Sequence, residues 1–111
     1  MASYTYTVNN VGASAYTFSG IANNNPTLSF NTGDVVTFNM SASGHPFFIK
    51  TSSITGTGNQ YNSGVTNNGS STGTITFTIP ADAPSTLFYV CQFHGSMACL
   101  LYTSDAADDG L

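Results

Sequence analysis

Apolar and polar residues alternate along most of this chain with the two-residue period of β-strands. In residues 4–8, two tyrosines and a valine alternate with threonines; in residues 74–79, isoleucine, phenylalanine and isoleucine do so. Such alternation predicts strands with one buried side and one solvent-facing side. No segment has the apolar stripe of a helix. The same pattern predicts further strands at residues 15–18, 27–30, 35–40, 46–50 and 87–91.

Turn-forming residues separate these strands. Asn31-Thr32-Gly33-Asp34 lies between two of them and predicts a hairpin turn. Residues 55–73 are rich in Gly, Asn, Ser and Thr, which predicts a long surface connection between the two halves of the fold. About seven or eight short strands with turns between them favour an all-β fold, a β-sandwich.

Charged residues are scarce, and this scarcity excludes several functions. Lys50 is the only basic residue among 111, and the formal net charge is −4. Binding to double-stranded nucleic acid requires several cations that neutralise phosphates, so we expect no nucleic-acid partner. The sequence contains no run of about 20 apolar residues, the length that a membrane-spanning helix requires. The length fits one small domain with a single core.

The two ends of the sequence carry further signals. The start lacks the basic and apolar regions of a signal peptide. At the other end, Cys-Leu-Leu-Tyr-Thr-Ser-Asp-Ala-Ala-Asp at residues 99–108 resembles the translation of a transposase-based sequencing adapter. We therefore predict a domain over residues 1–98 and a non-native, adapter-derived tail over residues 99–111. The first residues of this tail favour β-structure and can add a strand by accident.

Four residues suggest a metal site. Cys91, His94 and Met97 lie in one short segment after a predicted strand, at C-x2-H-x2-M spacing, and His45 lies in a turn upstream. A thiolate, two imidazoles and a weak thioether suit one copper ion that cycles between Cu(I) and Cu(II), because soft sulfur stabilises Cu(I) and imidazole binds both states. We therefore predict a copper site formed by His45, Cys91, His94 and Met97.

The same residues allow other interpretations. A buried cysteine is often an inert apolar residue, and strand parity places Cys91 on the inward face. A Cys91–Cys99 disulfide would suit an oxidising compartment. Zinc is the competing metal, but it prefers four firm ligands, for which Met97 is a poor fourth. A nucleophilic Cys91 with His94 as its base is a further alternative, although no oxyanion-hole motif is visible.

From about residue 27 to residue 98, the sequence resembles the cupredoxins, the small blue-copper proteins that include plastocyanin, pseudoazurin and amicyanin. The resemblance rests on residues 31–39, on Gly44-His45-Pro46, on residues 73–80 and on the closing segment at residues 88–97. The order His, Cys-x2-His-x2-Met is the order of the family's ligands. The short ligand loop is most similar to that of amicyanin.

The resemblance implies a Greek-key sandwich with a type 1 copper site at one end. His45 and His94 would bind the metal through ring nitrogens, Cys91 through its thiolate, and Met97 axially. The family often has an asparagine after the first histidine, and the backbone N–H of that residue donates to the cysteine sulfur. Here Pro46 has no N–H, so we expect redox tuning that departs from the family's pattern.

We therefore predict an electron-transfer protein, not an enzyme, that passes one electron to an unidentified redox partner. By resemblance, the partner would dock at an apolar patch around His94, lined by Pro46, Phe93 and Met97. The family also implies a periplasmic or extracellular monomer. One alternative is a β-sandwich interaction module, on a cell surface or a virion, with an incidental or structural copper site. Another is copper transport or storage.

Overall fold

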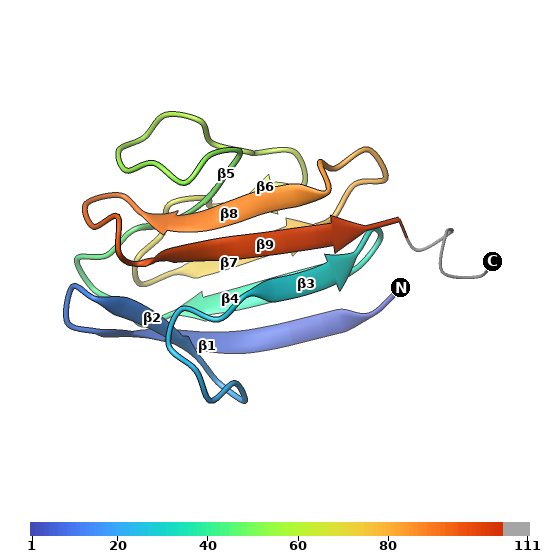
Figure 1. The fold of residues 1–111 in the computed structure, drawn as a ribbon. Helices are drawn as coiled ribbons and strands as arrows, with labels where there is room; N and C mark the ends of the chain where they lie inside the picture. Colours follow the sequence, from blue (N-terminus) through green and yellow to red (C-terminus); the bar gives the residue numbers. More distant parts are fainter. Residues whose placement is uncertain (106–111) are drawn as a thin grey trace.

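The computed structural model describes residues 1–105, which form nine strands and, within that range, no helix. The strands make two sheets that pack face to face, as Figure 1 shows. The all-β sandwich predicted from the alternation is therefore confirmed. The strands are β1 (Ser3–Val11), β2 (Ala15–Phe18), β3 (Leu28–Asn31), β4 (Val35–Met40), β5 (Phe47–Lys50), β6 (Val65–Thr66), β7 (Thr74–Thr78), β8 (Thr86–Cys91) and β9 (Ala98–Ser104).

The five-stranded sheet has the order β2-β1-β4-β7-β6, and the four-stranded sheet has the order β3-β9-β8-β5. Two pairs are parallel, β1 with β4 and β3 with β9, and the other pairs are antiparallel. The chain passes repeatedly from one sheet to the other, as in a Greek-key sandwich. The long connection after β5 joins the two sheets, as predicted, but it contains the short strand β6, which was not predicted and which forms because Val65 and Thr66 pair with Phe77 and Thr76 of β7.

The turn at residues 31–34 is present, but the hairpin prediction is wrong. The strands on either side of this turn, β3 and β4, belong to different sheets and do not pair. Asp34 is buried, and its carboxylate accepts hydrogen bonds from the backbone N–H groups of Ala2 and Asn31, both at 2.9 Å. Gly33 N donates to Ile79 O at 2.8 Å. These contacts direct the chain across the sandwich, which the turn residues alone do not specify.

The last strand lies inside its sheet. β9 pairs with β8 on one side and with β3 on the other, and its Leu101 side chain is completely buried. Strand pairing depends on backbone and side-chain pattern and not on the origin of the sequence. The adapter-derived tail thus stays a prediction, and residues 106–111 of that tail lie outside the described residues.

Aromatic rings fill the space between the sheets. Phe47 stacks on Tyr89 with ring centroids 5.4 Å apart, and Phe18 packs edge-on against both of them. Because Phe47 begins β5 and Tyr89 belongs to β8, this packing fixes the two strands that lead to the predicted metal ligands. Among the described residues, no helix is long and apolar enough to cross a membrane.

Candidate metal centre

Strand pairing brings the two predicted ligand loops to the same end of the sandwich. β5 and β8 are antiparallel, and Phe47 lies opposite Cys91. His45 comes two residues before Phe47, and His94 comes three residues after Cys91. The turn that enters β5 and the loop that leaves β8 are therefore neighbours. Gln92 N donates to Pro46 O at 3.0 Å, which ties the two loops together.

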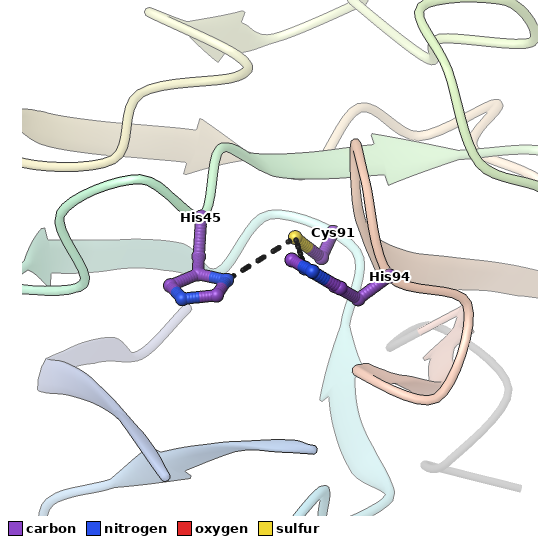
Figure 2. A group of neighbouring side chains, drawn as sticks. All are labelled: His45, Cys91 and His94. Atoms are coloured by element: carbon purple, nitrogen blue, oxygen red, sulfur yellow. Dashed lines mark hydrogen bonds between the residues drawn. The ribbon is translucent and has the colours of Figure 1, made fainter. Parts of the chain in front are cut away.

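His45, Cys91 and His94 converge on a common point. Cys91 Sγ lies 3.8 Å from His45 Nδ1 and 3.7 Å from His94 Nδ1, and the imidazole centroids are 5.0 Å apart. The three potential ligand atoms all lie within 4.8 Å of one another. Figure 2 shows both rings turned toward the sulfur. Cys91 is fully buried, whereas the histidines are half-buried, so the group lies just beneath the surface.

The loop from Cys91 to Met97 is closed by its own backbone. Cys91 N donates to Met97 O at 3.0 Å, and Met97 N donates to His94 O at 3.1 Å. The Met97 side chain is fully buried in the same apolar core as Cys91. The structure thus holds Met97 at the base of the ligand loop. Its predicted role as a fourth, axial ligand stays a prediction.

Residues outside the predicted ligand set hold both loops in place. Tyr16 of β2 donates its hydroxyl proton to His45 O at 2.7 Å. Asn25 Nδ2 donates to Ser96 O at 3.0 Å, in the loop that carries His94. Lys50 Nζ donates to the carbonyls of Ile54 and Gly56, and Gly56 N in turn donates to Gln92 O beside Cys91.

Sequence reasoning did not find these supporting residues. Tyr16, Asn25 and Lys50 lie between 41 and 75 positions from Cys91 in the sequence. No local motif connects a strand tyrosine, a loop asparagine or a lone lysine to a distant metal site. The isolation of Lys50, as the only basic residue of the chain, was the one available signal. A single cation kept inside an otherwise uncharged β-strand points to a structural role.

Burial perturbs the tyrosine next to the ligands. Burial, and then the charge and hydrogen bonding of the adjacent Cys91 side chain, raise the pKa of Tyr16 far above its usual range. Tyr89 is buried in the same core and its pKa is also raised, first by burial and then by the charge of Cys99. Both hydroxyls therefore stay protonated, and both donate to backbone carbonyls, of His45 and Pro26 respectively.

Several alternative interpretations of Cys91 do not fit the structure. Cys91 and Cys99 are both free thiols, so there is no disulfide between them. Cys99 Sγ instead lies 3.4 Å from Thr27 Oγ1. A nucleophile must reach its substrate, but Cys91 is fully buried. Two imidazole nitrogens face the Cys91 sulfur, an arrangement that an inert apolar cysteine does not require.

The apolar patch around His94 stays a prediction, and two exposed apolar side chains lie on the segments beside that residue. Phe93, next to His94, is 60% exposed. Ile54 is also exposed, and the following Thr55 side chain approaches Gly95 of the ligand loop. The prediction that Met97 lines this patch is wrong, because its side chain is fully buried. The backbone bonds of Met97 turn its side chain into the core and leave Phe93 outside.

The donor set decides which metals this group can hold. Two imidazoles and one thiolate, with a thioether nearby, match the His₂Cys sites in which copper is bound with a weak axial sulfur. Zinc sites usually have four firm nitrogen, oxygen or thiolate ligands. The group found here contains three such ligands and no carboxylate. The residues therefore fit copper better than zinc.

No protein-family model and no curated protein matches this sequence. Solved structures do match the fold. Rusticyanin from Thiobacillus ferrooxidans superposes with a TM-score of 0.60 at 18% identity over 90% of this chain and 76% of that one. A rusticyanin structure described as that of a copper protein gives a TM-score of 0.61 at 17% identity. Fet3p, a multicopper oxidase that functions in iron import, gives 0.50 at 15% identity over 96% of this chain but 24% of that one. The chain thus has the fold of the cupredoxins, the blue-copper proteins, and carries a converging His, Cys and His group at one end of the sandwich.

Proposed function

We propose that this protein binds one copper ion through His45, Cys91, His94 and Met97 and acts as a one-electron carrier. The observation that carries the proposal is the convergence of Cys91 Sγ with the Nδ1 atoms of both histidines. When bound, copper supplies the Cu(I)/Cu(II) couple. The fold, shared with the copper protein rusticyanin at low sequence identity, supports the proposal independently of the site geometry.

The protein's part in this function is to hold the ligands in place. β5 and β8 pair with each other and direct buried side chains into the core, and the two loops are tied by the Gln92–Pro46 hydrogen bond. Fixed ligands reduce the rearrangement that accompanies a change of oxidation state. The burial of Cys91 keeps solvent from the sulfur, while half-buried His94 beside exposed Phe93 offers an edge to a redox partner. We propose that a redox partner docks beside His94 and that the protein works in the periplasm or outside the cell.

Loading the purified protein with Cu(II) tests the proposal. We expect an intense visible charge-transfer band from a thiolate bound to Cu(II), and reversible loss of the band on reduction. Cys91→Ser should abolish the band because an alcohol cannot replace the soft thiolate donor. The matched control is Cys99→Ser, which removes the other thiol of the chain and should leave the band unchanged.

The outcomes separate the carrier from its alternatives. A wild-type protein that stays colourless with Cu(II) would refute the carrier proposal and favour the alternative of a β-sandwich interaction module. Tight copper binding without reversible reduction would favour transport or storage. Met97→Gln should keep the copper but lower the potential, since a harder axial ligand favours Cu(II). An unchanged potential in this variant would remove Met97 from the ligand set.

A further inference from the structure

Ser96 ties the ligand loop, residues 91–97, to the side of the molecule that carries the five-stranded sheet. Its carbonyl accepts a hydrogen bond from Asn25 Nδ2 at 3.0 Å, and its hydroxyl donates to Ala13 O at 3.2 Å. Ala13 lies in the turn between β1 and β2, and Asn25 lies in the connection after β2. The ligand loop itself joins β8 to β9 in the other sheet. Figure 1 shows the β1–β2 turn and the β8–β9 loop at the same end of the sandwich, where these two bonds connect them.

Asn25 is itself held by β2. Its backbone N–H donates to Tyr16 O at 2.9 Å, and its Oδ1 accepts from Tyr16 N at 2.9 Å. β2 ends its sheet, so Asn25 makes the bonds that a further strand would make at Tyr16, which is completely buried. One Nδ2 proton is directed to Ser14 O at 3.3 Å, and the other is directed to Ser96 O. The amide is thus held in one orientation, with a donor directed at the ligand loop.

Asparagine suits this position for two reasons. The φ angle of Asn25 is +46°, in the left-handed region that asparagine and aspartate adopt more readily than other non-glycine residues. Its amide also has both an acceptor and donors, which Tyr16 and Ser96 use together. An aspartate satisfies the first requirement, but its carboxylate cannot donate to Ser96 O. The two requirements can therefore be separated by one substitution.

We propose that Asn25 is a positioning residue of the metal centre, which together with the Ser96 hydroxyl holds the ligand loop in place and slows the release of copper. The inference rests on the proposed copper function. Ser96 lies between His94 and Met97 in the sequence. A bound metal leaves only when its ligands separate, and a loop that opens must break its bonds to Asn25 and Ala13. Loss of these bonds therefore favours the open loop.

Asn25→Asp tests this inference because aspartate is similar in shape, tolerates the same φ and can still accept from Tyr16 N, but loses the donor to Ser96 O. One hydrogen bond changes an equilibrium constant by roughly twofold to tenfold. In the metal-free protein, we expect the Met97 N–H, which is bonded to His94 O, to exchange with solvent faster by that factor, as measured by NMR. In the copper-loaded protein, release of the metal to an excess of chelator should be faster by a similar factor.

The matched control is Asn67→Asp. Asn67 also has a positive φ, of 62°, and its Nδ2 also donates to a backbone carbonyl, that of Thr74 at 3.1 Å. Thr74 begins β7, outside the ligand loop. A purely structural role for Asn25 predicts that Met97 exchange and copper release follow the global stability in urea and change alike in both variants. Faster exchange and release confined to Asn25→Asp support the inference.

The remaining outcomes are distinct. If the wild-type protein shows the charge-transfer band but Asn25→Asp keeps the wild-type exchange and release rates, the inference is overturned and the carrier proposal stands. If the wild-type protein shows no band, both fall. If Asn25→Asp does not fold, Ser96→Ala takes its place, because it removes only the hydroxyl of an exposed residue that donates to Ala13 O. Both rates should then rise, and unchanged rates would overturn the inference.

Discussion

Asn68 joins the long connection after β5 to the outer edge of that strand. Its Oδ1 accepts from Ile49 N at 2.8 Å, and its Nδ2 donates to Ile49 O at 3.1 Å and to Tyr61 O at 3.2 Å. β5 ends its sheet, and on its outer side the chain offers only an isolated bridge between Lys50 and Gln60, which leaves the N–H of Ile49 without a backbone partner. At the buried residue Ile49, the side chain of Asn68 makes the hydrogen bonds that a neighbouring strand would otherwise make.

Asn68→Ala should therefore destabilise the protein. The carbonyl of Ile49 keeps a second donor, Tyr61 N at 2.9 Å, but the N–H of Ile49 loses its partner. An unpaired buried N–H costs about 1–3 kcal/mol, and each ordinary hydrogen bond lost adds about 0.5–1.5 kcal/mol. With two bonds lost from the two Nδ2 protons, we expect the free energy of unfolding to fall by about 2–6 kcal/mol, a large part of the ~5–15 kcal/mol of a typical domain.

Urea denaturation followed by tyrosine fluorescence measures this change, since the chain contains no tryptophan. The matched control is Asn62→Ala, which removes only the exposed contact between Asn68 Nδ2 and Asn62 Oδ1. The control should change the stability by less than about 0.5 kcal/mol. A loss below about 1 kcal/mol for Asn68→Ala, or equal losses for both variants, would refute the argument from the unpaired N–H.

Two further predictions concern Lys50 and the last strand. Burial lowers the pKa of Lys50 below its usual value of 10.5, so as pH approaches that value the unfolded chain binds more protons than the folded one. The wild type should therefore gain stability relative to Lys50→Met as pH rises from 8 to about 10, and parallel urea curves across that range would contradict this. Leu101→Ala should cost about 2–5 kcal/mol, because the side chain is fully buried. Tyr102→Ala, at a partly exposed neighbour, should cost less, and equal losses in urea would mean that β9 does not pack as described. Genomic reads across residues 98 and 99 test separately whether that strand belongs to the natural gene.

The local sequence was sufficient for every described strand except β6 and for the chemistry of the ligands. Alternation over residues 74–79 identifies β7 because side chains of a strand point to opposite faces at every step, whatever the rest of the fold does. Because Cys91, His94 and Met97 follow one another at steps of three residues in the sequence, these side chains must belong to one short loop. Residue type then limits the metal, since a thiolate with imidazoles selects soft or borderline ions.

The tertiary structure decided which strands pair and which residues support the site. The turn at residues 31–34 has the composition of a hairpin, yet the buried carboxylate of Asp34 and the bond from Gly33 to Ile79 send the chain to the other sheet. Tyr4 follows the alternation of a buried face but is 37% exposed, near an end of the sandwich. Tyr16 reaches His45 only because two sheets pack face to face. Contacts of this kind join residues far apart in the chain, and a local pattern contains no information about which distant partner a buried side chain will meet.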